Sequence, residues 1–275
     1  MSSAASSATS AMGSSLPGAI PGVVAVNTFR EAVRDRILYN LIFFALVMIG
    51  AAILVGQISI GIERLVIVNL GLSAISIFGL IMAIFIGVGL VSKEIEKRTL
   101  YSLLAKPIRR WEFLVGRYAG LLLTLLVNTS LMTLGLAGAL LYVSRHFERG
   151  DASILLAVYF ILLELALVTA LALFFSCFSS PVLSTLYTIG IYVAGVFAND
   201  IHAVGQFTKN PAMEAVTRVV YYLLPNFHNF NIIAAASHGD AIPFSLVWQN
   251  TFYAALYVAV ILIAAAAVFS SRNLK

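Results

Sequence analysis

The stretch SKEIEKRTLYSLLAKPIRRWEFLVGRY, residues 92–118, holds seven Lys/Arg and three Glu among its 27 residues. It lies between two long apolar runs in a chain of 275 residues that is 61% hydrophobic and only 11% charged. With a mean hydropathy of +0.98, the chain is too apolar to form a soluble domain of this size. The sequence therefore predicts a membrane protein that gathers seven of its 17 basic residues in one loop.

Six apolar segments are long enough, or nearly so, to cross a membrane, which takes about 17–25 residues. They are residues 37–56, 69–91, 119–143, 153–176, 182–198 and 252–270. The fifth is short and polar in places, so a re-entrant segment is the alternative there, but six spans give a consistent topology. We expect an all-α polytopic membrane protein with six transmembrane helices.

The distribution of basic residues predicts the orientation. Placing both termini and the 92–118 loop on one side collects 12 of the 17 Lys/Arg there and leaves five on the other. By the positive-inside rule the first side is cytoplasmic, which predicts a multi-pass protein of the cell (cytoplasmic) membrane with both termini inside. The net charge of +5 is then explained by orientation and by contact with membrane lipids, and we expect no nucleic acid as a partner.

The N-terminal part divides into a tail and a helix. Residues 1–21, rich in Ser and Ala and without a charged side chain, predict a disordered tail, which leaves 22–275 as one transmembrane domain. In VNTFREAVRDRILYN, residues 26–40, apolar side chains recur at helical spacing between charged ones. This pattern favours an N-terminal helix lying in the membrane interface, and a plain extension of the first span is the alternative.

The loop from 199 to 251 is far longer than an ordinary connection of about 4–6 residues. Within it, PAMEAVTRVVYYLLP begins with Pro211, which suits a first helical turn, and Pro225 closes the apolar repeat. We expect re-entrant helices in this outer loop, of which the one beginning at Pro211 dips into the outer leaflet.

The opening stretch itself predicts two short helices. KEIEKRTLYSLLA, residues 93–105, has amphipathic spacing, and Pro107 biases the residue before it away from the helical region. A second helix then runs into the third span. Two helices with a proline-broken elbow favour a surface that docks another protein, whereas an orientation signal with incidental helicity is the alternative.

These residues resemble the ABC-2 type permeases, the membrane subunits of one class of ATP-binding-cassette exporters. The resemblance rests on Glu94, Glu96, Arg98-Thr99-Leu100, Leu103-Leu104-Ala105-Lys106-Pro107, Arg110-Trp111-Glu112-Phe113 and Gly116-Arg117-Tyr118. Arg98 stands where the family more often has Gly. The likeness extends over residues 25–275, and YLLPNFHNFNI, residues 222–232, is similar to a branch described as involved in multicopper enzyme maturation.

The resemblance implies that the segment after the second span carries a coupling helix that sits in a cleft of an ATPase. The docking residues would be Glu94, Glu96, Arg98, Thr99, Pro107, Arg110 and Trp111. No G-x-x-x-x-G-K-[ST] motif occurs in the chain, so ATP and Mg would be bound by a separate ABC ATPase subunit. We therefore expect a transport subunit, not an enzyme, without a cofactor of its own, paired with a second permease copy or a paralogue.

Glu164 is the formal charge deepest inside a predicted span, where a charged residue costs about 2.5–3.5 kcal/mol. With Ser184 and Thr188 it predicts a polar pathway, and a structural carboxyl is the alternative. Gly190 and Gly195 suit close packing, within the chain or at a dimer seam. An outer gate is expected at Tyr222, Pro225, Asn226 and Asn229.

The outer loop also holds His202, His228 and His238, whose spacing matches no ligand motif, so ordinary interfacial histidines are favoured over a metal site. Two functions of other classes remain as alternatives to the permease. One is a membrane-embedded enzyme that modifies lipid or peptide, and the other is a membrane scaffold that does not transport.

Overall fold

The computed structural model describes residues 19–34, 36–59, 61–96, 110–144, 151–207 and 211–271. All regular elements within these ranges are helices, and the ranges contain no strand. The helices are α1 Ala19–Val33, α2 Arg36–Ile58, α3 Glu63–Glu96, α5 Arg110–Ser144, α6 Asp151–Ser176, α7 Pro181–Val196, α8 Ala198–Phe207, α9 Pro211–Leu223, the 3-10 helix η2 Phe227–Phe230, α10 Ile233–His238 and α11 Phe244–Ser271. The predicted all-α polytopic class is confirmed.

Five helices in the described ranges are long and apolar enough to cross a membrane: Leu38–Ile58, Glu63–Gly89, Trp111–Val143, Ala152–Ser176 and Phe244–Phe269. The predicted fifth span corresponds to α7 and α8, two helices that meet at a bend of 61°. Counted as one broken span, this pair brings the number to six. A bend of this kind fits a broken span as well as the re-entrant segment that the sequence left open.

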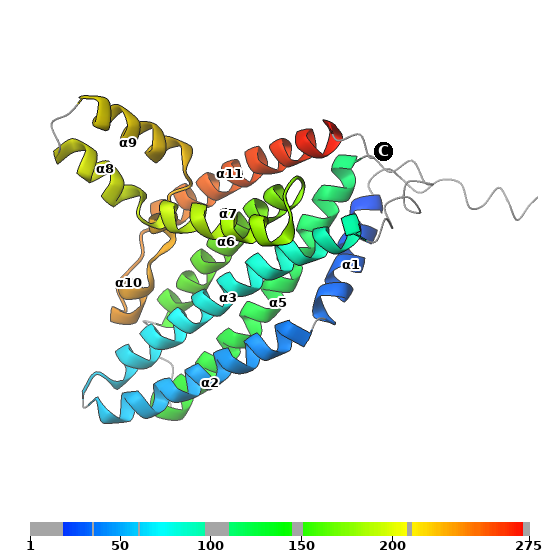
Figure 1. The fold of residues 1–275 in the computed structure, drawn as a ribbon. Coiled ribbons are helices and arrows are strands. Elements are labelled where there is room, and N and C mark those ends of the chain that lie inside the picture. The colour runs from blue at the N-terminus through cyan, green and yellow to red at the C-terminus, as the bar shows by residue number, and fades with distance from the viewer. Residues whose placement is uncertain are drawn as a thin grey trace, which may run out of the picture.

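Helices α3 and α5 are longer than the spans expected for them. They contain 34 and 35 residues, about 50 Å each at about 1.5 Å per residue, whereas the hydrocarbon core of a bilayer is about 30 Å thick. Both must therefore extend beyond the membrane. Figure 1 shows the end of α3 and the start of α5 at the same end of the bundle, beside α1 and the end of α11.

The core lies where α3 packs against α6 and α5. Small residues permit the close approach of α3 and α6, since a Cβ added at Gly79 would lie 2.7 Å from the side chain of Leu165. About two turns further along both helices, a Cβ added at Gly87 would lie 2.8 Å from the Cβ atom of Ala172. Ile75, Met82 and other apolar side chains fill the space around these contacts. Glycine at a helix crossing of this kind is typical of membrane bundles.

Helix α1, which contains most of the helix predicted for the membrane interface, packs against the first part of α5. Gly116 and Gly120 of α5 face it, and a Cβ at Gly120 would lie 2.5 Å from the carbonyl oxygen of Ala25. Thr28 is buried in this contact, whereas Val26 is exposed. The predicted tail falls outside the described residues up to position 18, and α1 begins within its last three residues, at Ala19.

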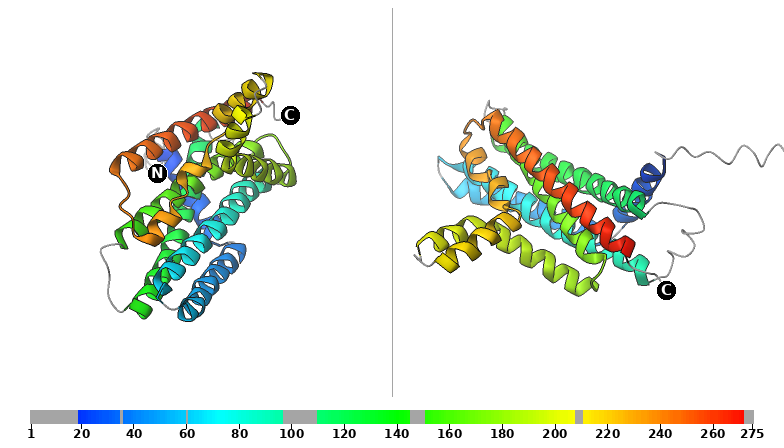
Figure 2. Two further views of the ribbon diagram at one scale, coloured as in Figure 1. Left: turned by 90° about the vertical axis from the view of Figure 1, so that its left-hand side faces the viewer. Right: turned by 90° about the horizontal axis from the view of Figure 1, so that it is seen from above.

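The periphery of the bundle is formed by α2, α7 and α11. Along α11 an apolar stripe of exposed side chains recurs at intervals of four and three residues: Phe244, Trp248, Phe252, Leu256, Val260 and Ile263. A stripe of this kind is typical of a lipid-facing side. In the view from above, α7 also lies at the edge of the bundle (Figure 2).

At the end of the bundle opposite α1, α8 and α9 form a helical hairpin that projects from it (Figure 1). The helix predicted to begin at Pro211 is confirmed as α9. The sequence analysis gave no bounds for α8 and α10, and α11 begins eight residues before the span expected from 252. Most of the long outer loop is therefore helical.

Candidate functional site

Glu164 lies at the midpoint of the α6 span, in the interior of the bundle, with 7% of its surface exposed. The hydroxyl of Tyr192, on α7, donates a hydrogen bond of 2.8 Å to its Oε1 atom. A buried carboxyl group in an apolar environment needs such a partner, because an unpaired polar atom there carries a desolvation penalty. The contact joins α6 and α7 at the depth where the sequence predicted a polar pathway.

Tyr192 shares one face of α7 with Ser184 and Thr188, since the three residues follow each other at intervals of four. Ser184 and Thr188 are fully buried, and the Thr188 hydroxyl donates to the backbone oxygen of Ser184 at 2.7 Å. The Ser184 hydroxyl oxygen has no hydrogen-bond partner in the described part of the chain. The three predicted intramembrane residues thus lie on two adjacent helices, α6 and α7.

Tyr192 was missed by the sequence reasoning. The spacing of Ser184, Thr188 and Tyr192 is the signal that could have found it, because it continues the polar face of α7 by one turn. A tyrosine in an apolar segment is ordinarily assigned to the membrane interface, so its place beside Glu164 is a result of the fold.

The aromatic ring of Tyr192 connects this contact to the segment around η2. Its centroid lies 5.0 Å from that of Phe227, a fully buried residue. Gly195, one turn after Tyr192, approaches the backbone oxygen of Pro225 so closely that no Cβ would fit there. Gly190 is on the other side of α7 and has no atom within 4 Å of the place of a Cβ. Gly195 therefore packs within the chain.

The four predicted gate residues lie in or beside the segment that covers this end of α7. Pro225 and Asn226 are buried, whereas Tyr222 and Asn229 are exposed. The Asn226 side-chain amide donates to Oδ1 of Asn199 at 2.7 Å, which joins the segment to α8.

The same segment is tied to α11 through its backbone. The N–H of Asn226 donates to the hydroxyl oxygen of Tyr253 at 2.8 Å, and the hydroxyl of Tyr257 donates to the backbone oxygen of Tyr222 at 3.1 Å. The rings of Tyr253 and Tyr257 lie 4.7 Å apart. The gate segment is therefore fixed between α7, α8 and α11.

Of the predicted docking residues, those that the structure describes lie at the opposite end of the bundle. Arg98, Thr99 and Pro107 fall outside the described residues. Glu94 and Glu96 belong to the last turn of α3, and Arg110 is the first residue of α5. Trp111, at the start of the α5 span, is 49% exposed.

Next to Trp111, α5 holds two buried charged residues, Glu112 and Arg117. The Arg117 guanidinium lies 5.4 Å from the ring centroid of Phe113, at cation–π distance. Phe113 in turn stacks on Phe269 of α11 at 6.4 Å. The first turns of α5 are thus packed against the end of α11.

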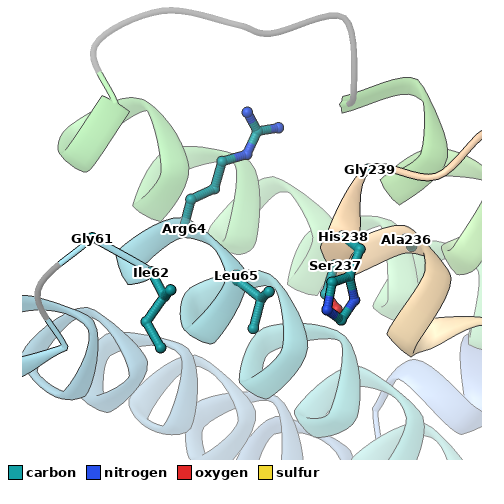
Figure 3. A pocket seen from close by; sticks show the side chains of 8 residues that line it. All are labelled: Gly61, Ile62, Arg64, Leu65, Ala236, Ser237, His238 and Gly239. Carbon is teal, nitrogen blue, oxygen red and sulfur yellow. The ribbon is translucent and has the colours of Figure 1, made fainter.

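A pocket of about 300 Å³ lies at the other end of the bundle, between the first turn of α3 and the end of α10. Figure 3 shows the His238 and Ser237 side chains beside that turn, whereas Arg64 extends away from Ile62 and Leu65. The pocket contains none of the predicted site residues. Among the described residues no group of three or more His, Cys, Asp or Glu is placed to hold a metal ion.

Comparison with known proteins places this bundle in a family. The family described as "ABC-2 family transporter protein" matches residues 23–274, nearly the whole chain. The chain belongs to the ABC-2 transporter family. It is thus the permease component of an ABC transporter, a transport subunit of the membrane and not itself an enzyme. No curated protein matches the permease.

Proposed function

We propose that this ABC-2 permease exports its substrate across the cytoplasmic membrane, driven by ATP hydrolysis in a separate ABC ATPase subunit. Both termini and the 92–118 segment would be cytoplasmic, as the excess of Lys/Arg at that end favours. ATP and Mg would be bound by the ATPase, since the permease sequence contains no P-loop motif.

One observation carries this proposal. Two helices longer than the membrane is thick, α3 and α5, extend from the same end of the bundle and bound the 97–109 segment between them. A force applied to that segment would act on both helices, and through them on the core contacts that α3 makes with α6. The resemblance of residues 94–118 to a coupling segment supports the same assignment.

The docking surface would comprise the 97–109 segment with Glu94, Glu96, Arg110 and Trp111. An exposed tryptophan is a common anchor of protein interfaces, where its truncation often costs about 2 kcal/mol or more. At the opposite end, the segment around Asn226 would act as the outer gate above Glu164, Ser184 and Thr188. A second permease copy, or a paralogue, would complete the transporter.

The test is purification of the tagged permease in mild detergent, with every co-purifying protein identified by mass spectrometry. The chain has two tryptophans, which offers a matched pair of variants. Trp111→Ala and Glu94→Ala alter the proposed docking end, whereas Trp248→Ala alters an exposed tryptophan on α11 at the other end.

We expect a P-loop ATPase to co-purify with the wild type and with Trp248→Ala, and to be lost with Trp111→Ala and reduced with Glu94→Ala. If no P-loop ATPase accompanies a folded wild-type permease, the proposed coupling to an ATPase is wrong. If the ATPase is retained by Trp111→Ala but lost with Trp248→Ala, the docking surface is at the other end.

A further inference from the structure

Charged side chains are rare in the middle of the described spans. In the five long described spans, the charged side chains other than Glu164 are Glu63 and Arg64 near the start of α3 and Glu112 and Arg117 near the start of α5. Glu164 alone occupies the midpoint of a span, where a charge is most costly. An ionisable residue at such a place is retained in membrane proteins mainly where it serves a pathway or a ligand.

Glu164 has no positively charged partner among the residues that the structure describes. Its hydrogen bond comes from the neutral hydroxyl of Tyr192. A buried carboxylate is stabilised far better by a cation than by a neutral donor. The site therefore favours a ligand that brings a positive charge.

The surroundings of the carboxyl group are apolar and aromatic. Phe160, one turn before Glu164 on α6, is fully buried, and the rings of Tyr192 and Phe227 lie 5.0 Å apart on the side of α7. Aromatic faces attract organic cations by the cation–π interaction, and apolar walls favour an apolar body around the charge. Together with one carboxylate, these groups fit a hydrophobic cation better than a small hydrated ion.

Helix α7 lies between Glu164 and the surface of the bundle. Tyr192 faces Glu164, whereas Leu186, Ile189 and Val193 on the other side of α7 are exposed. Helix α7 lies at the edge of the bundle (Figure 2), so an outward movement of this helix would uncover the carboxyl group of Glu164. A cation dissolved in the lipid could then reach Glu164 from the side.

We propose that the permease recognises a hydrophobic organic cation, with Glu164 as its counter-charge and the rings of Tyr192 and Phe227 as its aromatic contacts. This inference rests on the proposed transport function and names the substrate class of the same intramembrane site. Without a bound cation, the Tyr192 hydroxyl is the hydrogen-bond partner of the Glu164 carboxyl group, as in this structure. When the cation binds, it takes the place of the Tyr192 hydroxyl beside Glu164.

Two substitutions separate this role from a purely structural one. Glu164→Gln removes the charge, but the amide oxygen still accepts the hydrogen bond from Tyr192, so a structural contact survives. Tyr192→Phe removes the hydroxyl but keeps the ring and the charge of Glu164. Glu164→Gln therefore removes the counter-charge but keeps the hydrogen bond. Tyr192→Phe keeps the counter-charge but removes the hydrogen bond.

The experiment measures binding to the purified permease by equilibrium dialysis. The probes are tetraphenylphosphonium and dodecyltrimethylammonium, both hydrophobic cations, and tetraphenylborate, an anion of nearly the same shape as the first. Binding does not need the ATPase, so failure of the proposed function leaves this measurement intact. Glu31→Gln, at an exposed position on α1, serves as the control for the same chemical change.

We expect at least one cation to bind the wild type and the Glu31→Gln variant, with tetraphenylborate bound far more weakly. Glu164→Gln should weaken cation binding about tenfold or more, as for loss of a charge-assisted partner, and Tyr192→Phe by no more than about twofold. Glu164→Asp, which retains the charge on a shorter side chain, should bind better than Glu164→Gln. Size-exclusion profiles establish that each variant is folded.

Three results would overturn the inference. The first is binding of neither cation by the folded wild type, and the second is equal binding of tetraphenylborate. The third is the reverse pattern, with Tyr192→Phe impaired and Glu164→Gln normal, which assigns the pair a structural role only. With the ATPase-containing complex in proteoliposomes held at zero membrane potential, ATP-driven uptake of the bound cation tests transport separately from recognition.

Discussion

The hydroxyl of Tyr192 donates a 2.8 Å hydrogen bond to Oε1 of Glu164, which joins the buried side of α7 to the midpoint of α6. The same end of α7 also packs on Pro225 and Phe227 through Gly195, whereas the opposite side of the helix is exposed. The hydrogen bond between Tyr192 and Glu164 should therefore help to hold α7 against α6.

Tyr192→Phe should lower the thermal stability of the permease modestly. Hydrogen bonds between membrane helices contribute about 0.6 kcal/mol on average and up to about 1.7 kcal/mol, so we expect a decrease in that range. Tyr187→Phe is the matched control, since Tyr187 lies on the same helix but is 45% exposed. Thermal unfolding in detergent measures both variants, and equal midpoints for the two would show that the Tyr192 hydroxyl contributes nothing to stability.

The spans of α2, α5 and α6 could be predicted from the sequence. A long apolar segment in a bilayer must satisfy its backbone hydrogen bonds within itself, which a helix does. The same rule says little about α7 and α8, where the chain is short, polar in places and bent. The bend at Phe197 is supported from outside the segment, by the fit of Pro225 and Phe227 against Gly195. Such long-range packing has no signal in local composition.

The candidate site was predictable in part for a similar reason. Glu164 stands out in an apolar run, because a carboxyl group there is costly and rare. Its partner Tyr192, 28 residues away, depends on how α6 and α7 pack, which periodicity alone does not specify. Asn226 and Asn199 show the same limit, since a hydrogen bond between an irregular segment and α8 requires the fold first.

Gly120→Ala should destabilise the permease although alanine is the better helix former. A Cβ at Gly120 would lie 2.5 Å from the carbonyl oxygen of Ala25, so α1 must shift away from α5. Overpacking of this kind typically costs about 1–3 kcal/mol, which exceeds the gain in helix propensity of about 1 kcal/mol.

The control for this prediction is Gly138→Ala on the same helix, where no atom lies within 4 Å of the added Cβ. It should leave stability unchanged or raise it slightly. Thermal unfolding of both variants in the same detergent gives the comparison. Equal or higher stability of Gly120→Ala would mean that α1 is not packed closely on α5.

Gly195→Ala should loosen the segment proposed as the outer gate. The added Cβ would collide with the backbone of Pro225 and lie 2.7 Å from the ring of Phe227, so residues 224–232 must move. Gly190→Ala is the matched control on the exposed side of α7, with no atom within 4 Å. Hydrogen exchange measured by mass spectrometry should rise in peptides covering 224–232 for Gly195→Ala alone. Unchanged exchange in the Gly195→Ala variant would mean that packing on Gly195 of α7 does not hold residues 224–232 in place.

The proposed orientation predicts which end of the bundle is reached from outside the cell. Val23 on α1 and Phe207 at the end of α8 are both well exposed, on opposite ends of the chain's fold, and the single native cysteine, Cys177, is buried. In a Cys177→Ser background, a membrane-impermeant maleimide should label Phe207→Cys in right-side-out vesicles and Val23→Cys in inverted ones. Detergent-solubilised samples, in which both cysteines should react, control for reactivity. The opposite pattern would place the 92–118 segment outside the cytoplasm, where no ATP-driven subunit could act on it, and the direction of coupling proposed for α3 and α5 would have to be abandoned.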